Sequence, residues 1–138
     1  MTVSDQILSL ILDEQRRQDG HFIDVPDLSE YLIKLASRAE LVSLCSCERC
    51  RGFAAFYCNN FEDGVAYLTL LAVDPRDRGL GLGRALTALV LKVAKNLGFS
   101  KCRLEVRKEN RNAYGMYVSL GFTIAEDRGE KYLLEVFL

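Results

Sequence analysis

The chain has 138 residues, of which 49% are hydrophobic and 27% charged, and its net charge is −1. This length and balance predict one folded domain over residues 1–138 and exclude a largely disordered chain. The charge lacks the positive field of a dedicated nucleic-acid binder. No apolar run approaches the roughly 18 residues of a membrane span, and the start of the chain lacks a signal-peptide pattern. We therefore expect a cytoplasmic protein, monomer or homodimer, without nucleic-acid or membrane partners.

The first part of the chain predicts two helices. Apolar residues at helical spacing follow Ser4, a residue type that caps helix starts, and the pattern ends by Gly20. Asp27 stands three residues before Glu30 in the pattern of a capping box, and a second apolar stripe follows it. We therefore expect one helix after Ser4 and another after Asp27.

The remaining segments predict a mixed sheet. Runs with strand character occupy residues 41–47, 52–58, 65–73, 102–106, 122–125 and 132–137. Apolar residues at helical spacing follow the run 65–73 and the run 102–106. The third run is apolar throughout, as a central strand buried on both faces would be. The first two runs predict a hairpin, and the order strand, loop, helix, strand predicts a parallel pair. The expected fold class is α/β (α+β).

Three alternating glycines, Gly79, Gly81 and Gly83, connect the third strand to the helix that follows. Glycine permits positive φ angles and lets a ligand approach the backbone closely. The first amides of a helix have no intrahelical acceptor and carry partial positive charge, and Arg78 and Arg84 add full charges beside them. Phosphate is the ligand that suits this arrangement best, although a connection without a ligand has the same composition.

Two familiar phosphate-binding loops do not fit this segment. A mononucleotide P-loop ends in Gly-Lys-Ser or Gly-Lys-Thr, which the segment lacks. The dinucleotide fingerprint needs a third glycine three residues after Gly81, and Arg84 stands there. The sequence therefore favours a different phosphate ligand.

The same segment resembles the signature of a protein family. The run Arg78-Gly79-Leu80-Gly81-Leu82-Gly83 is similar to the Arg-x-x-Gly-x-Gly acetyl-coenzyme A signature of the GCN5-related N-acetyltransferase (GNAT) family. The second motif of that family is matched, at its spacing, by Asn110, Ala113, Tyr117, Gly121 and Phe122. One helix and one strand separate the two motifs, as in the family, and the resemblance covers roughly residues 65–122.

The resemblance implies a splayed mixed sheet, flanked by about four helices, with acetyl-CoA in the split between the central strand and the next. It implies that backbone amides of residues 79–84 hold the pyrophosphate, that the end of the central strand pairs with the pantetheine arm, and that Asn110 contacts this arm. The cofactor-binding residues expected on this basis are Leu71, Ala72, Val73, Arg78, Gly79, Leu80, Gly81, Leu82, Gly83, Arg84, Asn110, Ala113 and Tyr117.

Tyr117 is the expected general acid. When an amine attacks a thioester, the leaving thiolate is best protonated by a positioned acid. The resemblance places Tyr117 at the thioester sulfur, and helical spacing puts it on a neighbouring face to Asn110 and Ala113 of the same helix. The alternative is a tyrosine that only packs, with its hydroxyl bonded to the backbone.

Glu105 is the expected general base, because an amine of pKa about 10.4 must lose a proton before it attacks. The run Leu104-Glu105-Val106-Arg107 resembles the branch of the family that acetylates protein N-termini, where this glutamate is the base. The alternative is a glutamate paired with Arg103 or Arg107, with ordered water as the base. Many family members carry a carboxylate on the preceding strand, where this chain has Leu70.

The five cysteines, an odd number, are expected to be reduced. Cys45, Cys47 and Cys50 allow a zinc interpretation, but no fourth ligand accompanies them, so we expect no metal. Small buried thiols behave as apolar residues, and we expect Cys58 and Cys102 in the core.

Two features near the N-terminus concern the acceptor side of the expected site. The family ordinarily begins with a strand before its first helix, whereas here that strand is missing or reduced to residues 1–3. His21, the single histidine, lies in an expected loop that borders the acceptor site in the family.

Together these patterns predict an N-acetyltransferase that moves the acetyl group of acetyl-CoA to a primary amine by direct attack in a ternary complex. The acceptor is a small molecule, an amino sugar or a peptide N-terminus. Two alternatives keep the fold: a non-catalytic acetyl-CoA sensor, and a protein-interaction module that binds no nucleotide.

Overall fold

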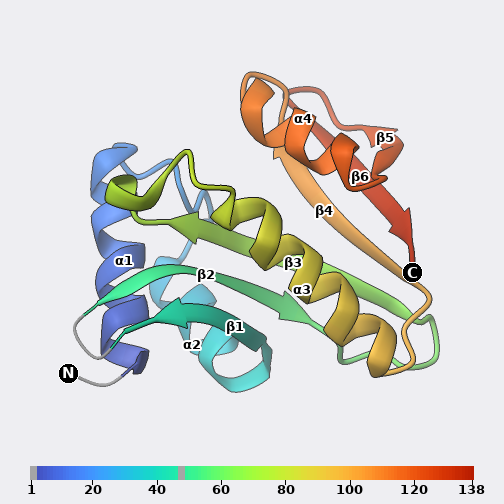
Figure 1. Ribbon diagram of the computed structural model, residues 1–138, viewed down its shortest axis with the longest axis horizontal. Helices are drawn as coiled ribbons and strands as arrows, with labels where there is room; N and C mark the ends of the chain where they lie inside the picture. Colours follow the sequence, from blue (N-terminus) through green and yellow to red (C-terminus); the bar gives the residue numbers. More distant parts are fainter. Residues whose placement is uncertain (1–2, 47–48) are drawn as a thin grey trace.

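The computed structural model describes residues 3–46 and 49–138. Its elements, in chain order, are α1 (Val3–Arg17), α2 (Leu28–Arg38), β1 (Glu40–Cys45), β2 (Cys50–Tyr57), β3 (Val65–Val73), the 3-10 turn η1 (Pro75–Asp77), α3 (Leu82–Asn96), β4 (Lys101–Arg107), α4 (Arg111–Ser119), β5 (Thr123–Asp127) and β6 (Lys131–Phe137). The strands form one sheet in the order β1-β2-β3-β4-β6-β5. Figure 1 shows α3 across one face, and β4, β5, β6 and α4 diverging from the other strands.

The pairing of the strands confirms the mixed sheet expected from the sequence. β3 and β4 are parallel neighbours, whereas every other adjacent pair is antiparallel. Cys45 lies opposite Cys50 in the β1–β2 hairpin. Residues 47–48, which include Cys47 and the start of the expected turn, lie outside the described residues.

The N-terminal helices begin and end close to the positions that the sequence predicts. Val3 is already helical, so no strand precedes α1 within the described residues, and residues 1–2 lie outside them. The chain leaves α1 through Gly20, which has a φ of 83°. Asp27 caps α2 with its carboxylate, which accepts a hydrogen bond from the backbone N–H of Glu30 at 3.0 Å.

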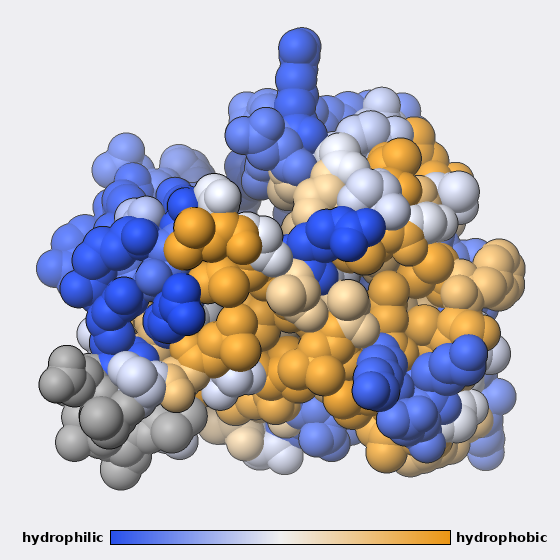
Figure 2. All heavy atoms as spheres, viewed as in Figure 1, coloured by the Kyte–Doolittle hydropathy of each residue, from blue (hydrophilic) through white to orange (hydrophobic). Residues whose placement is uncertain are grey.

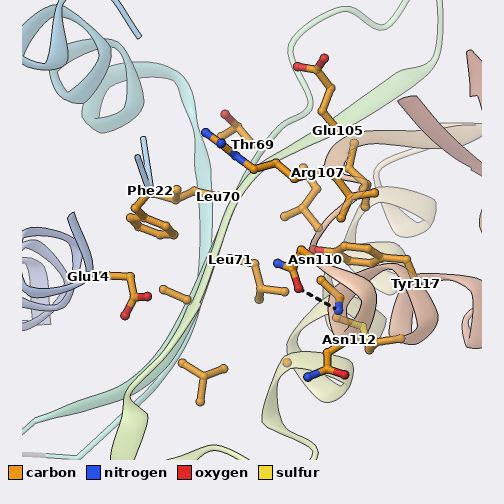
Figure 3. Close-up of a pocket in the computed structure, with 18 of the residues that line it drawn as sticks. Glu14, Phe22, Thr69, Leu70, Leu71, Glu105, Arg107, Asn110, Asn112 and Tyr117 are labelled. Carbon is orange, nitrogen blue, oxygen red and sulfur yellow. Dashed lines mark hydrogen bonds between the residues drawn. The ribbon is translucent and has the colours of Figure 1, made fainter. Parts of the chain in front are cut away.

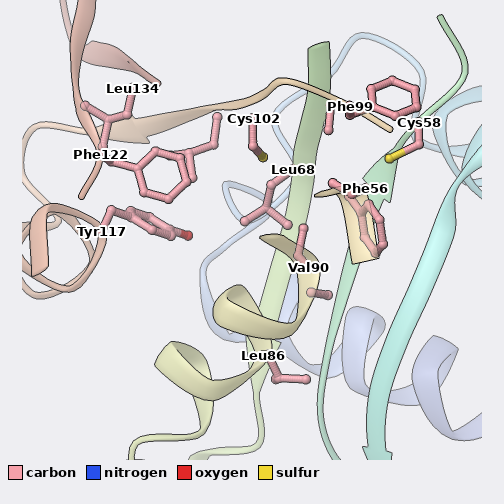
Figure 4. Packing of buried hydrophobic residues seen from close by; sticks show 14 of the residues in the cluster. Phe56, Cys58, Leu68, Leu86, Val90, Phe99, Cys102, Tyr117, Phe122 and Leu134 are labelled. Carbon is pink, nitrogen blue, oxygen red and sulfur yellow. The ribbon is translucent and has the colours of Figure 1, made fainter. Parts of the chain in front are cut away.

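The sheet separates two apolar clusters. One lies under α1 and α2 and includes Phe53, and the other lies under α3 and α4 and includes Phe56. Figure 4 shows the second cluster, in which Leu68 and Val90 meet between the sheet and α3. A β-bulge at Thr69 adds one residue to β3 opposite β2, so Leu68 points to one cluster and Leu70 to the other.

β3 and β4 diverge soon after they begin. They pair only from Val65 to Tyr67 on β3 and from Lys101 to Arg103 on β4. β3 contributes buried side chains to both faces of the sheet, with Ala66 and Leu68 in one apolar cluster and Leu70 and Ala72 in the other. The side chains between them are only half-buried, and the second half of the strand borders a cleft where a continuous sheet would place another strand.

The face that carries α3 is partly apolar at its surface. Apolar side chains gather over this helix and hydrophilic side chains border them (Figure 2). The exposed apolar residues of this region include Leu80, Leu89 and Leu97. No helix in the described part of the chain combines the length and the apolar character needed to cross a membrane.

Candidate active site

A cleft of about 920 Å³ lies where β3 and β4 diverge. One end is formed by the loop that precedes α3 and by the first turn of that helix, and the other end by the loop between α1 and α2. Figure 3 shows Leu71 of β3 on one side of this space and Asn110 and Tyr117 on the other. The divergence of two neighbouring strands therefore creates the site.

The end of β3 presents backbone groups to this cleft. Beyond Tyr67, no described strand pairs with the edge of β3 that faces β4. The backbone N–H and C=O groups of successive residues point to opposite edges of a strand. Within the segment Leu71, Ala72 and Val73, every second residue therefore points its N–H and C=O toward the cleft. The carbonyl oxygen of Val73 accepts a hydrogen bond from Nε of Arg78 at 3.3 Å. An extended chain that contains amides can add to such an edge as an extra strand.

The glycine-rich loop opens the N-terminus of α3 to one end of the cleft. Gly79 and Gly81 have φ angles of 79° and 78°, and an added Cβ at either would meet nothing within 4 Å. Gly81 caps α3 without a side-chain hydrogen bond. No described side chain or loop carbonyl accepts a hydrogen bond from the N–H groups of residues 82–84. These amides are therefore available to the oxygens of a phosphate group.

Arg78 is directed toward α1. Its Nη2 lies 2.9 Å from Oε1 of Glu14, which is buried. Burial acts to raise the pKa of Glu14, but hydrogen bonds from Gln18 and Arg17 and the charge of Arg78 hold that pKa below its usual value. The sequence predicts the charge of Arg78 at the phosphate site; in the structure Arg78 lines the cleft and its guanidinium shares Glu14 with Arg17. Arg78 thereby fastens the glycine-rich loop to α1.

Two aspartates fasten the same loop to the β1–β2 hairpin. Asp77 is buried and forms ion pairs with Arg49 and Arg51. Asp74 pairs with Arg76 at 2.8 Å and with Arg49 at 3.6 Å. Hydrogen bonds from Arg76 lower the pKa of Asp74 to about 2. These ion pairs fix the direction in which the chain leaves β3.

Sequence reasoning missed Glu14, Asp74 and Asp77. A signal exists for Glu14, because it stands three residues after Ile11 on the buried side of α1, where a carboxylate needs a partner. Asp74 precedes Pro75, a pattern typical of a capped turn, and its carboxylate caps η1. Asp77 has no comparable signal, because its arginine partners lie 26 and 28 residues away in the chain.

Arg84 reaches from the first turn of α3 to the C-terminal end of α4. Its Nε lies 3.3 Å from Oγ of Ser119, and its Nη2 lies 3.5 Å from the carbonyl oxygen of the same residue. The C-terminal end of a helix attracts cations. Arg84 therefore bridges the two helices beside the cleft and remains exposed to it.

Tyr117 lies at the edge of the apolar cluster under α4. Its ring packs edge-on against Phe122 with 5.6 Å between centroids, and reaches from α4 into the cleft (Figure 3). Burial raises the pKa of its hydroxyl well above the usual value for tyrosine. No described residue forms a hydrogen bond with this hydroxyl, so the backbone-bonded alternative has no support. The phenol therefore keeps its proton and presents it to the cleft.

Asn110 and Ala113 stand at the start of α4. The carboxamide oxygen of Asn110 caps the helix by accepting a hydrogen bond from the backbone N–H of Ala113 at 3.2 Å. Both residues line the cleft, and Figure 3 shows Asn110 across from Leu71. The carboxamide nitrogen of Asn110 is not needed for the cap, so it can donate to a ligand.

Glu105 lies on the opposite face of β4 from Tyr117. Its neighbours Leu104 and Val106 are buried in the cluster that holds Tyr117, whereas Glu105 points away from it (Figure 3). The carboxylate of Glu105 accepts a hydrogen bond from the hydroxyl of Tyr67 and pairs with Arg128, each at 3.3 Å. The structure thus brings Glu105 and Tyr117 to the same cleft from two sides.

The basic residues on either side of Glu105 have other partners. Arg103 pairs with Glu135 at 2.6 Å. Arg107 donates to the carbonyl oxygen of His21 at 3.1 Å and pairs with Asp24 at 3.3 Å. Arg107 thereby connects β4 to the loop between α1 and α2, and His21 lines the cleft there.

The described cysteines are free thiols. Burial raises the pKa values of Cys50 and Cys102 to about 12 and that of Cys58 to about 11. All three are buried among apolar residues, and Cys58 and Cys102 lie in the core as expected. Within residues 3–46 and 49–138, no three His, Cys, Asp or Glu side chains are grouped as metal ligands.

Comparison with known proteins places the two motifs in a family. The model of the acetyltransferase (GNAT) family matches residues 7–122, which confirms the resemblance found in the sequence. Mycothiol acetyltransferase of Thermomonospora curvata is 41% identical over 61 residues, which are 44% of this chain and 20% of that protein. The chain thus matches about a fifth of the length of this relative.

Two solved structures have the same fold. The ribosomal-protein-S18-alanine N-acetyltransferase from Escherichia coli superimposes with a TM-score of 0.75 at 22% identity, over 99% of this chain and 90% of that one. The paia N-acetyltransferase from Thermoplasma acidophilum, in complex with coenzyme A, has a TM-score of 0.68 at 19% identity, over 100% of this chain and 81% of that one. These likenesses show the splayed sheet of the family.

Proposed function

We propose that this chain, which belongs to the acetyltransferase (GNAT) family, transfers the acetyl group of acetyl-CoA to a primary amine by direct attack in a ternary complex. One observation carries this proposal. The unpaired edge of β3, the start of α3 with its free backbone amides, and the hydroxyl of Tyr117 all open into one cleft. The start of α3 can bind a diphosphate, the edge of β3 can bind an extended arm that contains amides, and the hydroxyl of Tyr117 can protonate a leaving group.

The residues at the α3 end fit the donor. Backbone N–H groups of residues 79–84 surround a position for the diphosphate of acetyl-CoA. Leu71, Ala72 and Val73 offer the strand edge that the amides of the pantetheine arm can join. Asn110 and Ala113 face that edge from α4. Arg84 adds positive charge beside the diphosphate, while Arg78 acts by anchoring the loop to α1.

Two proton transfers accompany the reaction, one from the acceptor amine and one to the leaving sulfur, and a different residue carries out each. Acetyl-CoA supplies an activated acetyl group, whose carbonyl carbon bonds to the amine nitrogen as the carbon–sulfur bond breaks. Glu105 removes a proton from the acceptor nitrogen, directly or through one water. Tyr117 donates its phenolic proton to the sulfur. A backbone N–H near Val73, left unpaired by the divergence of β4, stabilises the negative charge on the carbonyl oxygen.

The acceptor approaches from the face of the sheet that carries Glu105. This face is bordered by the loop that contains His21, which Arg107 ties to β4. The acceptor in this proposal is a small-molecule or peptide amine. The proposed location is the cytoplasm, where the four described free cysteines stay reduced, and the proposed oligomeric state is a monomer or homodimer.

Two measurements test the proposal. Thermal unfolding with acetyl-CoA measures donor binding, because a ligand at 100 times its Kd adds about 2.7 kcal/mol to the free energy of unfolding. ADP, which carries a diphosphate but no pantetheine arm, is the matched control. Release of free CoA, followed over a panel of primary amines, measures transfer. We expect acetyl-CoA to stabilise the protein against thermal unfolding more than ADP does. We also expect free CoA to be released only when an amine acceptor is present.

The outcomes separate the proposal from its alternatives. Stabilisation by acetyl-CoA without release for any amine favours a CoA sensor on the same fold. Absence of stabilisation at saturating acetyl-CoA favours a protein-interaction module and overturns the proposal.

A further inference from the structure

A second hollow, of about 450 Å³, opens beside the acceptor end of the cleft. We propose that it binds an anionic oxygen group of the acceptor, a carboxylate or a phosphate, so that the natural substrates are primary amines that also carry a negative charge. This inference rests on the proposed transfer reaction and adds the class of its acceptor.

The hollow and the cleft share part of their walls. The lining residues of the hollow are Tyr31, Lys34, Arg38, Tyr57, Asn59, Tyr67 and Thr69. Three of these, Tyr31, Tyr67 and Thr69, also line the cleft. The hydroxyls of Tyr31 and Thr69 are hydrogen-bonded at 2.8 Å, which ties α2 to the bulge of β3 at this boundary. A molecule in the acceptor end of the cleft can therefore extend past these side chains into the hollow.

The charge in the hollow is positive. Tyr31, Lys34 and Arg38 stand at spacings of three and four residues on α2, which puts them on one side of that helix. Nζ of Lys34 lies 5.4 Å from the centre of the Tyr57 ring, which holds the ammonium group over the hollow. Neither Lys34 nor Arg38 forms an ion pair with a described residue, and the described lining includes no carboxylate.

A carboxylate lies on the cleft side of the same boundary. Tyr67, which lines both spaces, donates its hydroxyl to the carboxylate of Glu105 at 3.3 Å, and Glu105 also pairs with the half-exposed Arg128. In the proposed reaction Glu105 receives the amine, while Lys34 and Arg38 face the part of the acceptor that extends beyond Tyr31 and Thr69. An acceptor with an amine at one end and an anion at the other satisfies both charges at once, whereas a neutral alkylamine leaves the two cations without a partner.

Matched acceptors test this inference through CoA release. The panel pairs β-alanine with propylamine, 6-aminohexanoate with hexylamine, and phosphoethanolamine with ethanolamine. We expect the KM for the anionic member of at least one pair to be about 5- to 30-fold lower than for its neutral partner, the range of two partly exposed ion pairs. The carboxylate and phosphate pairs distinguish the two sources of the anion.

The variant Lys34→Gln with Arg38→Gln removes both charges and keeps most of the side-chain volume. We expect it to lose the preference for the anionic amine, with unchanged turnover of the neutral amine and unchanged stabilisation by acetyl-CoA. The control is Lys92→Gln with Lys95→Gln, which removes two exposed charges from α3, outside both lining sets. The control should keep the preference.

Several results would overturn the inference and leave the transfer reaction standing. These are equal KM values within every pair, or a preference that survives in the Lys34 and Arg38 variant. Calorimetric binding of the same amines in the presence of CoA gives a readout that does not require turnover. If no amine is acetylated, the proposed function fails. The calorimetric measurement then still tests the hollow: tighter binding of the anionic amines that is lost without Lys34 and Arg38 supports an anion site, and equal binding overturns it.

Discussion

The hydroxyl of Tyr117 is placed to act as an acid because its ring is buried and its oxygen faces the cleft. We expect Tyr117→Phe to lower kcat by about 10²- to 10⁴-fold with little change in acetyl-CoA binding. Steady-state kinetics and thermal shift measure the two quantities. Tyr114→Phe, on the same helix but packed at a tilt against Tyr132 and outside the cleft lining, is the matched control and should retain activity. A normal rate in the Tyr117 variant would remove the acid from the mechanism.

The role of Glu105 predicts a loss that depends on pH. We expect Glu105→Gln to reduce kcat/KM by about 10²-fold near pH 7, because a free amine is scarce there. The loss should shrink as pH rises toward the pKa of the acceptor, since more of the amine then arrives deprotonated. Glu109→Gln removes a carboxylate on an exposed side chain and serves as the control. A loss of constant size at every pH would assign the proton transfer to water and leave Glu105 a structural role.

At the scale of elements, the ion pair between Glu14 and Arg78 joins α1 to the loop that precedes α3. Glu14 is buried, whereas Arg78 is about half exposed, so the substitution Glu14→Gln removes a buried carboxylate that accepts charge-assisted hydrogen bonds from Arg78 and Arg17. We expect Glu14→Gln to lower the free energy of unfolding by about 1–3 kcal/mol and to weaken acetyl-CoA binding. Urea unfolding measures the first effect and titration calorimetry the second. In a double-mutant cycle with Arg78→Gln, the two losses should not add; additive losses would show that the pair is uncoupled.

The ion pairs of Asp74 make the attachment of the same loop depend on pH. The pKa of Asp74 is lowered to about 2 in the folded chain, below the ordinary value of about 3.9. Its contribution to stability is therefore complete above about pH 4 and is lost as pH falls toward about 2. We expect Asp74→Asn to be less stable than the native chain at pH 7, with a difference that disappears in acid. Asp13→Asn, at an exposed pair, is the control for urea unfolding across this range. A difference that is the same at every pH would contradict this assignment.

At the scale of the whole molecule, the sequence predicts the elements well and their long-range contacts poorly. Local signals such as the cap at Asp27 and the positive-φ glycines at 79 and 81 mark where helices begin, and the structure agrees with them. The bulge at Thr69 has no local signal, yet it decides which face Leu70 and Leu71 occupy.

In the candidate site, too, the residues in local motifs could be predicted from the sequence, whereas the ion pairs between distant residues could not. The glycine-rich loop and Tyr117 stand in motifs that can be found along the chain. The partner of Arg78 lies 64 residues away on α1, and Glu105 pairs with Arg128 in place of its neighbours on β4. Side-chain pairing across the sheet depends on the tertiary fold, and a single sequence does not encode it in any local pattern.

Backbone N–H groups of the loop before α3 and of β3 receive acetyl-CoA in the proposed reaction, so amide hydrogen exchange followed by NMR tests their role most directly. Saturating acetyl-CoA should slow exchange and shift the amide resonances of residues 79–84 and of Leu71 to Val73, while amides of the distant β5 stay unchanged. Amides at the start of α3 that exchange and resonate identically with and without acetyl-CoA would contradict the proposed binding of the diphosphate there.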